Sequence, residues 1–321
     1  MRSKLFALSF LLAACGSGVT VAGPVTTRTP EATIPPATTT IAANQPGETS
    51  IPSSPTTTTQ PTGTSSPRTT TTAGAATELV VFFLADGGDT ASRSGPFLIA
   101  VHREGPATLG VARAALEELI VGPSADEQAA GISSAVPSDT LLLGVTVVDS
   151  VATVDLSREF EAGGGSFSMF GRLAQLVFTV TQFPTVEAVE LRLDGEPVTI
   201  FGSEGLVLEG PIDREDYLEW APTIMVESPA YGGTLGPSGR ITGFAAVFEA
   251  TFQLAIVDGA GSVIAQPDFV MTDNGVGWGS FDVTVPYQVP APEWGTLRVW
   301  AYSAEDGSEE AVREYPVLLL P

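Results

Sequence analysis

Residues 16–76 of this 321-residue chain are rich in threonine and proline and contain almost no large apolar side chains. Such a segment cannot bury enough apolar surface to offset the conformational entropy that folding removes. The composition therefore predicts a disordered linker over residues 15–77 and confines folding to the part of the chain that follows. As a random coil, about 60 residues span roughly 40–45 Å, enough to hold a folded head away from its attachment point.

The first 14 residues have the pattern of a signal peptide. Arg2 and Lys4 form a basic start, and a short apolar run follows them. The run ends in LAACG (residues 12–16), which resembles a bacterial lipobox, where the cysteine thiol receives a diacylglycerol and cleavage occurs just before it. We therefore predict lipidation at Cys15, palmitate among the acyl chains, and an extracytoplasmic protein anchored to the cell membrane. The alternative is an ordinary secretory signal with a chance cysteine.

The chain is strongly acidic, with 37 Asp and Glu against 14 Lys and Arg and a formal net charge of -23. This charge repels nucleic acid and anionic lipid head groups, so no nucleic-acid partner is expected. We interpret the acidity as favouring solubility outside the cell over recognition of a basic partner. The single cysteine excludes an intrachain disulfide.

Residues 78–212 combine two long helical patterns with six strand-like runs, which indicates a compact α+β domain. The helical patterns cover residues 107–121 and 166–181, and Gly122-Pro123 ends the first of them. Ser124 and Glu127 have the spacing of a capping box for a short third helix. The predicted strands are 79–84, 97–102, 141–148, 151–156, 186–193 and 198–201, with an Asp-Gly hairpin turn between the last two.

Residues 220–321 show an all-β pattern, after a polar segment at 213–216 that we interpret as a hinge. Seven short strands in about 100 residues are typical of an immunoglobulin-like β-sandwich, here without its disulfide. Because each domain has its own apolar pattern, residues 78–210 and 220–321 are each expected to fold alone. The predicted strands are 223–228, 240–248, 250–257, 262–270, 279–285, 296–303 and 311–319.

Both folded segments resemble known families. The first resembles the GerMN domain of sporulation and spore-germination proteins, through LIVGP (119–123), AVPSDT (135–140), VDLS (154–157), QLVFTVTQFP (175–184) and VELRLDG (189–195). Residues 222–320 resemble the immunoglobulin-like domain that often follows it, through IMVESP (224–229), Gly243, FEA (248–250) and WGSF (278–281). The resemblance implies a multidomain envelope lipoprotein that scaffolds other proteins, and it brings no catalytic residue to this chain.

A few residues could carry chemistry, and each has a plainer interpretation. His102 is the single histidine that a Ser–His–acid triad would need, but it lies in a strand-like run without a nucleophile elbow. Glu117 and Glu118 are adjacent on a helix, so their carboxylates point in different directions and suit a solvated face better than glycoside hydrolysis. Two acidic turns, residues 86–89 and 273–275, could hold calcium but match no EF-hand loop.

Two further features involve glycine and aromatic side chains. The glycines at 163–165 precede a helix and could bind an anion, although they lack the P-loop lysine and the dinucleotide-binding spacing, so a flexible loop is the plainer interpretation. Trp278 and Phe281 could form a platform for a sugar, although a core tryptophan is ordinary in such a sandwich. We therefore expect no cofactor, no metal and no enzymatic activity.

The leading hypothesis is a membrane-anchored, non-catalytic scaffold or interaction module of the cell envelope, with envelope proteins as partners. The alternative is a glycan-binding lipoprotein that contacts peptidoglycan or a wall polysaccharide. A hydrolase is the third candidate, which the single histidine and the missing elbow disfavour.

Overall fold

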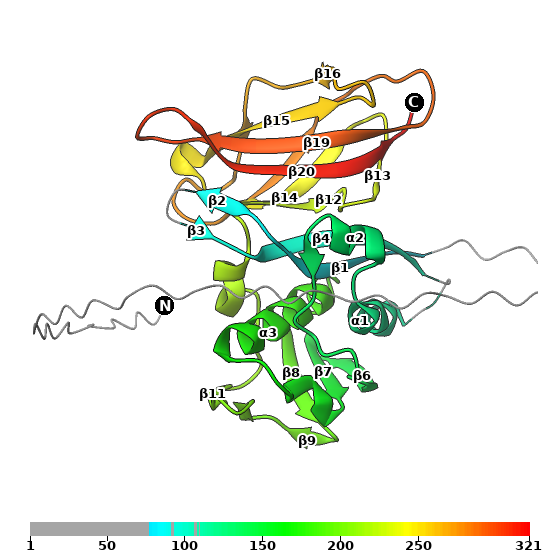
Figure 1. Cartoon of the computed structure of the whole chain (residues 1–321), viewed down its shortest axis with the longest axis vertical. Coiled ribbons are helices and arrows are strands. Elements are labelled where there is room, and N and C mark those ends of the chain that lie inside the picture. Colours follow the sequence, from blue (N-terminus) through cyan, green and yellow to red (C-terminus); the bar gives the residue numbers. More distant parts are fainter. Residues whose placement is uncertain (1–76, 91–92, 106–107, 109) are drawn as a thin grey trace, which may run out of the picture. The chain divides into compact units, whose positions relative to one another are not determined.

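The computed structural model describes residues 77–90, 93–105, 108 and 110–321, all within one compact unit of the chain, residues 69–321. The predicted signal peptide, Cys15 and nearly all of the Thr/Pro-rich linker lie outside the described residues. Within the described part, no helix is long and apolar enough to cross a membrane. The elements form a first lobe, from β1 to the 3-10 helix η2, and a second lobe, from β12 to β20 (Figure 1).

The first lobe packs α1 and α3 between two sheets (Figure 1). One sheet has the order β4-β1-β5 and the other β6-β7-β8-β9. Strands β7 and β8 are parallel, and α3 lies in the connection between them, as parallel pairing requires. The elements are β1 (Thr77–Ala85), β2 (Gly88–Thr90), β3 (Arg93–Ser94), β4 (Phe97–Gly105), α1 (Val111–Val121), α2 (Ala125–Ala129), β5 (Ile132–Ser133), β6 (Leu142–Val148), β7 (Val151–Leu156), η1 (Arg158–Glu161), α3 (Ser166–Val180), β8 (Ala188–Leu193), β9 (Glu196–Pro197), β10 (Ile200–Phe201), β11 (Leu206–Val207) and η2 (Glu215–Trp220).

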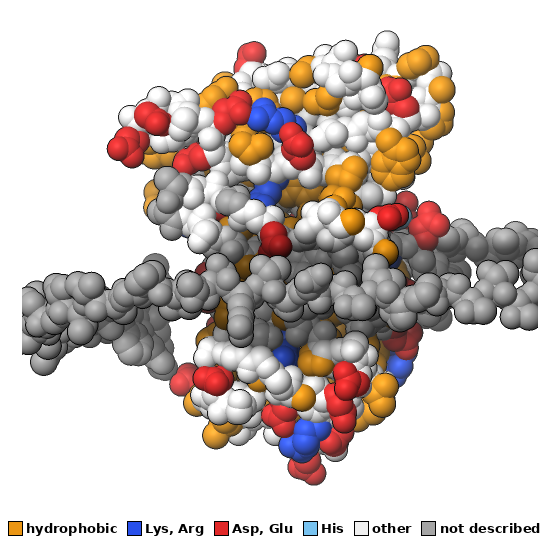
Figure 2. Space-filling model, in the orientation of Figure 1, with side chains coloured by type: hydrophobic (Ala, Val, Ile, Leu, Met, Phe, Trp, Pro, Cys, Tyr) orange, Lys and Arg blue, Asp and Glu red, His pale blue; other side chains and the backbone are white. Residues whose placement is uncertain are grey.

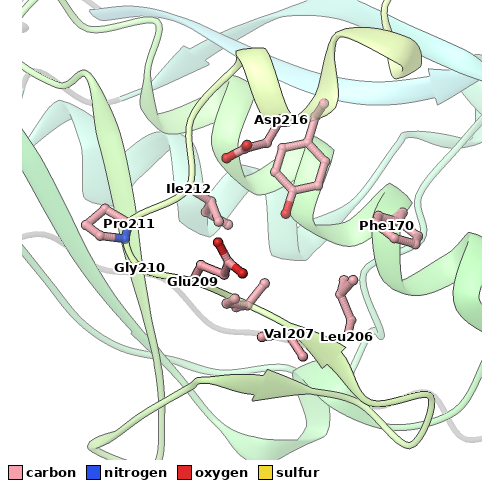
Figure 3. Close-up of a pocket in the computed structure, with 10 residues that line it drawn as sticks. Phe170, Leu206, Val207, Glu209, Gly210, Pro211, Ile212 and Asp216 are labelled. Atoms are coloured by element: carbon pink, nitrogen blue, oxygen red, sulfur yellow. The ribbon is translucent and has the colours of Figure 1, made fainter. Parts of the chain in front are cut away.

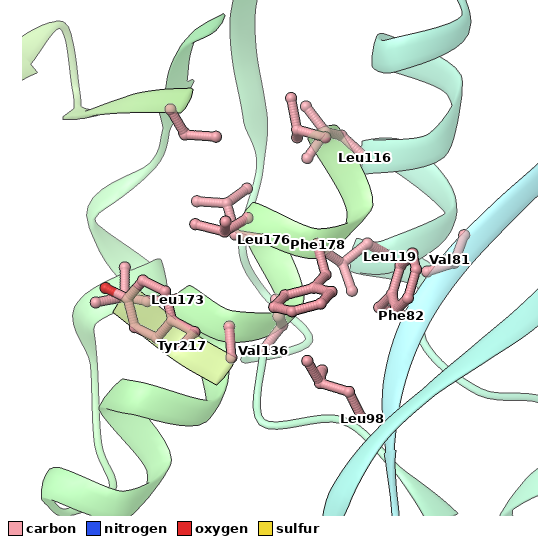
Figure 4. Packing of buried hydrophobic residues seen from close by; sticks show 14 of the residues in the cluster. Val81, Phe82, Leu98, Leu116, Leu119, Val136, Leu173, Leu176, Phe178 and Tyr217 are labelled. Carbon is pink, nitrogen blue, oxygen red and sulfur yellow. The ribbon is translucent and has the colours of Figure 1, made fainter. Parts of the chain in front are cut away.

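Helix α3 is the centre of this lobe, because it is buried on every side over most of its length. Its Leu173 and Phe178 meet Leu116 of α1 and Phe82 of β1 in one apolar core (Figure 4). The rings of Phe82 and Phe178 lie 5.5 Å apart, a separation typical of favourable aromatic pairs.

Two buried polar side chains of α3 complete the edge of β1. β5 pairs only with Leu84 and Ala85, so the backbone of Phe82 lacks a strand partner on that side. Thr179 accepts the Phe82 N–H at 3.1 Å, and the amide of Gln175 donates to the Phe82 carbonyl at 3.2 Å. Both polar groups are thereby satisfied in an apolar interior, where an unpaired group would cost about 1–3 kcal/mol.

Most local predictions for this lobe hold, although the first helix begins at Val111 and not at residue 107. The capping box is confirmed, since the Glu127 N–H donates to the Ser124 hydroxyl and the Ser124 N–H to the Glu127 carboxylate. The predicted hairpin partner at 198–201 is wrong in extent, because the pairing with β8 involves Glu196–Pro197 and ends with the Val198 N–H, which donates to the Leu191 carbonyl. Ile200 and Phe201 pair with β11 instead, because the chain turns back there to bury Phe201 in the core.

The second lobe is a sandwich with its own apolar core. Each of the seven predicted ranges contains a strand, although the range 262–270 holds only the three-residue β16 and the first residue of the short β17, and β13 is a short addition. The sheets have the orders β12-β14-β18 and β13-β20-β19-β15-β16, with β17 paired to β15. The elements are β12 (Ile224–Ser228), β13 (Thr234–Leu235), β14 (Arg240–Ala245), η3 (Phe248–Ala250), β15 (Thr251–Val257), β16 (Val263–Ala265), β17 (Val270–Met271), β18 (Gly279–Thr284), β19 (Glu293–Tyr302) and β20 (Glu309–Leu319).

Candidate functional site at the seam between the lobes

A buried carboxylate joins the two lobes. The side chain of Asp89, on β2, is 0% exposed and accepts hydrogen bonds from the N–H (2.9 Å) and hydroxyl (2.7 Å) of Thr223, just before β12. Arg93 donates to the same carboxylate at 2.7 Å and to the Ala221 carbonyl at 2.8 Å. The sequence predicted a plain turn at residues 86–89, and that is wrong for Asp89. Asp89 lies instead in β2, which pairs with β3, and its carboxylate binds Thr223 of the second lobe.

Backbone hydrogen bonds extend this contact, which we call the seam. The His102 N–H donates to the Tyr231 carbonyl at 2.9 Å, and the Tyr231 N–H donates to the Ala100 carbonyl at 2.8 Å. The second lobe thus closes the outer edge of β4. Met225 and Ala230 of the second lobe also belong to the apolar core of the first.

The segment at 213–216, predicted to be a hinge, is held at several points. Arg214 donates to the Thr181 hydroxyl at 2.8 Å and to the carboxylate of Glu227, on β12, at 2.6 Å. Its guanidinium also lies 4.7 Å from the centre of the Phe178 ring. The hinge interpretation is wrong because Arg214 binds side chains of both lobes and its guanidinium stacks on Phe178 in the core of the first lobe.

Two hollows flank the Arg214–Glu227 pair, and we call them together the seam groove. One hollow, of about 270 Å³, is bounded by Leu218, Phe244 and Trp278. The other, of about 300 Å³, includes Thr181, Gln182 and Thr242 in its lining. The groove therefore combines an aromatic wall, a cation, carboxylates and amide and hydroxyl groups.

Trp278 lies in this groove and not in the sandwich core. It is half-buried, and its ring meets that of Phe244 edge-on at 5.3 Å. The prediction of a core tryptophan is wrong because Trp278 lies on the face of the β12-β14-β18 sheet opposite to Phe281. Phe281 itself packs in the core against Phe252, with ring centres 4.9 Å apart.

A third hollow lies wholly in the first lobe. It has a volume of about 380 Å³ and is lined mainly by residues 206–212. Glu209 and Asp216 lie around it (Figure 3), and Tyr217 also lines it. Burial, and secondly the nearby Asp216 carboxylate, raise the pKa of the Tyr217 phenol. Asp216 accepts the Asp213 N–H at 3.1 Å, so this carboxylate holds the turn that starts η2.

The glycine loop at 163–165 accepts a hydrogen bond from Arg172, a residue that the sequence patterns did not single out. Arg172, on α3, is 3% exposed and donates to the carbonyls of Ala135 (2.9 Å), Phe160 (2.8 Å) and Gly163 (2.7 Å). Burial lowers the pKa of this guanidinium. The glycine loop thus offers a carbonyl to a buried cation. An arginine among apolar residues at helical spacing was the signal that could have revealed it.

The remaining candidates have structural partners. Half-buried His102 lies on β4 at the seam, where its N–H binds the second lobe. Glu117 pairs with Arg113 at 3.0 Å, whereas Glu118 lies 3.6 Å from Arg103, so the two carboxylates point apart as predicted. Asp273 accepts the Ser280 N–H at 2.6 Å and closes a turn.

Groups of three or more His, Cys, Asp or Glu arranged to hold a metal do not occur in the described part of the chain. Cys15, the predicted lipidation site, lies outside it. On the visible face, acidic side chains are spread over both lobes and basic ones are few (Figure 2).

Two family models match the chain. Germane, described as sporulation and spore germination, matches residues 80–199, and Gmad2, described as the immunoglobulin-like domain of bacterial spore germination, matches residues 223–308. The chain carries a Germane domain followed by a Gmad2 domain. These matches confirm the predicted family resemblance and the α+β domain followed by an immunoglobulin-like sandwich.

Solved structures similar to this Germane–Gmad2 chain include two from the sporulation protein GerM of Bacillus subtilis. Its first GerMN domain is 20% identical, with 44% of this chain and 99% of that chain covered and a TM-score of 0.36. Its tandem GerMN domains are 15% identical, with 77% and 61% covered and a TM-score of 0.38. A Clostridium perfringens protein provisionally described as a lipoprotein is 21% identical, with 44% and 89% covered and a TM-score of 0.31. A comparison with curated proteins found no significant match.

Proposed function

We propose that this Germane–Gmad2 chain is an extracytoplasmic lipoprotein, anchored through Cys15, whose head is a non-catalytic scaffold for envelope proteins. The observation that carries the scaffold role is the seam, where Asp89 is buried between partners from both lobes. A scaffold must present its binding surfaces at a constant distance and angle. Buried, hydrogen-bonded charge between two lobes supports that, because breaking such a contact is strongly unfavourable.

Anchoring is tested by replacing Cys15 with serine in the producing cell. Wild-type protein is expected in the membrane fraction. Mass spectrometry should find that its N-terminal peptide begins at Cys15 and that this cysteine is acylated. Cys15→Ser removes the thiol that accepts the lipid, so this variant should keep residues 1–14 and carry no acyl group. Ser17→Ala, next to the motif, is the matched control and should behave as wild type. An unmodified mature N-terminus elsewhere in the chain would refute the anchor.

The scaffold role is tested in the same cells with photo-crosslinking residues, one on each lobe. Val121 is 78% exposed and Val276 is 88% exposed, so both can carry a crosslinker without disturbing a core. In the anchored protein, both positions are expected to capture envelope proteins, and Cys15→Ser should reduce the yield. If anchoring is intact and neither position captures a protein, the scaffold role is wrong.

A second candidate function is binding of a wall glycan, and the seam groove favours it. The hollow that half-buried Trp278 lines also holds hydroxyl, carboxylate and guanidinium groups, which together suit a sugar ring and its hydroxyls.

Trp278→Ala separates this candidate from a purely structural role. Because Trp278 is only half-buried, the variant should lose about 1–2 kcal/mol of unfolding free energy, less than the ~3–5 kcal/mol of a core tryptophan. If the groove binds glycan, the variant also loses co-sedimentation with purified cell wall. Trp294→Ala is the matched control, since Trp294 is 56% exposed and lies away from the groove. Wild-type protein that does not sediment with wall would exclude the glycan function.

A further inference from the structure

The sheets of the first lobe have four long edges, and three of them are covered in part. Tyr231 of the second lobe covers part of the edge of β4, Gln175 and Thr179 of α3 cover part of the edge of β1, and β9 and Ile212 cover part of the edge of β8. The fourth edge belongs to β6, the end strand of the β6-β7-β8-β9 sheet. Among the described residues, no strand pairs with the outer side of β6. Antiparallel geometry directs the N–H and C=O groups of every second β6 residue to that side.

β6 is also apolar and uncharged. Residues 140–148 read TLLLGVTVV and contain no charged side chain, in a chain whose formal net charge is -23. The apolar side chains here remain largely in solvent, since Leu143 is 47%, Val147 41% and Val148 67% exposed. The strand therefore offers both free backbone groups and apolar contacts.

Two other free edges in the structure are protected, as sheet edges in natural proteins usually are. β18 carries Asp282, which Arg240 of β14 binds at 2.8 Å. β16 is only three residues long. β6 has seven residues with no charge or proline, and no strand pairs with its outer side within the described part of the chain.

Charge at the ends of β6 indicates what can bind there. Asp139 and Asp149 flank the uncharged run, both are exposed, and neither forms an ion pair with another described residue. If two copies of β6 paired antiparallel, Asp139 of one would lie near Asp149 of the other at both ends. Parallel pairing would likewise bring equal charges together. The strand thus disfavours a second copy and favours a segment with basic ends.

We propose that β6 is a docking edge for an extended segment of a partner protein, apolar at alternate positions and carrying Lys or Arg at both ends. The segment would add a fifth strand to the β6-β7-β8-β9 sheet. Backbone hydrogen bonds would supply affinity, and the flanking ion pairs would select the partner. This inference rests on the proposed scaffold function and specifies one of its contacts.

The test uses the full chain with Cys15→Ser and the labelled peptide Arg-Thr-Val-Thr-Val-Thr-Val-Arg, with binding measured by fluorescence anisotropy. We expect this peptide to bind, and amide exchange in β6 to slow when it does. The same peptide with Glu at both ends should bind more weakly. A version with proline at the central valine should not bind, because proline cannot donate to a strand ladder.

Variants locate the site. Asp139→Asn with Asp149→Asn should weaken binding of the Arg-ended peptide about four- to 25-fold, since one exposed ion pair is worth about a two- to fivefold change. Asparagine also tolerates the left-handed backbone of residue 149, whose φ is 49°. Thr146→Lys places a charge on the edge and should abolish binding. Thr284→Lys, the same exchange on exposed β18, is the matched control and should bind as wild type.

Three outcomes would overturn the inference. They are equal binding of Arg-ended and Glu-ended peptides, binding unaffected by Thr146→Lys, and a dimer in sedimentation that Thr146→Lys dissolves. The last would assign β6 to a second copy of the chain. Because membrane anchoring and crosslinking are measured separately, failure of the peptide test alone refutes the docking edge and leaves the scaffold proposal standing.

Discussion

Asp89→Ala is expected to lower the unfolding free energy of the described head by about 3–5 kcal/mol, the usual cost of removing one partner from a buried charge pair. The loss would leave Arg93 and the N–H and hydroxyl of Thr223 without the acceptor they share. The substitution would also remove the carboxylate that lies 3.8 Å from the guanidinium of Arg313. Two nitrogens of that guanidinium are buried and have no hydrogen-bond partner among the described residues. Urea unfolding followed by fluorescence measures the change.

In the same variant the two lobes should unfold independently, because Asp89 connects them. One transition in wild type is expected to become two in Asp89→Ala. Asp139→Ala removes an exposed carboxylate from the first lobe and is the matched control, with an expected change within about 0.5 kcal/mol. A loss below 1 kcal/mol in Asp89→Ala would show that the seam is not held by this carboxylate.

The seam also bears on the prediction that residues 78–210 and 220–321 each fold alone, which stays a prediction. Separation would expose Met225 and Ala230, which are buried in the core of the first lobe. It would also take Arg214 away from Glu227. The isolated halves should therefore be less stable than the apolar pattern of each half suggests.

Arg172→Met is expected to cost about 2–4 kcal/mol, although methionine fills much of the same space. The substitution removes every donor that satisfies the carbonyls of Ala135, Phe160 and Gly163. A net hydrogen bond to a charged group contributes about 1.5–3 kcal/mol, and relief of the buried charge offsets part of the sum. Thermal or urea unfolding of the full chain measures the loss.

Arg172→Lys refines this test. Lysine keeps the charge but lacks the planar fork of donors. The unfolding free energy of the Arg172→Lys protein should therefore lie between those of wild type and Arg172→Met. Arg158→Met is the matched control, because the Arg158 side chain is 60% exposed and its ion pairs lie at the surface. An Arg172→Met protein as stable as wild type would mean that the carbonyls find water or another donor.

The periodicity of the sequence determined most elements of both lobes. The strand β1, the helix α3, the capping box at Ser124 and the seven strands of the sandwich all follow from apolar spacing and turn residues. These features are local, because each depends on residues within a few positions of one another. The lipidation prediction at Cys15 is equally local, and it stays a prediction.

Tertiary structure alone decided the seam and the chemistry around it. Asp89 and Thr223 are 134 residues apart, and Gln175 lies 93 residues from Phe82, so no window of sequence contains both partners. Trp278 comes just before β18, on the opposite parity to Phe281, yet only the packing of the lobes places it in a groove and not in a core. Likewise, the pattern of β6 predicted a strand, but its free edge is visible only once every neighbouring strand has its position.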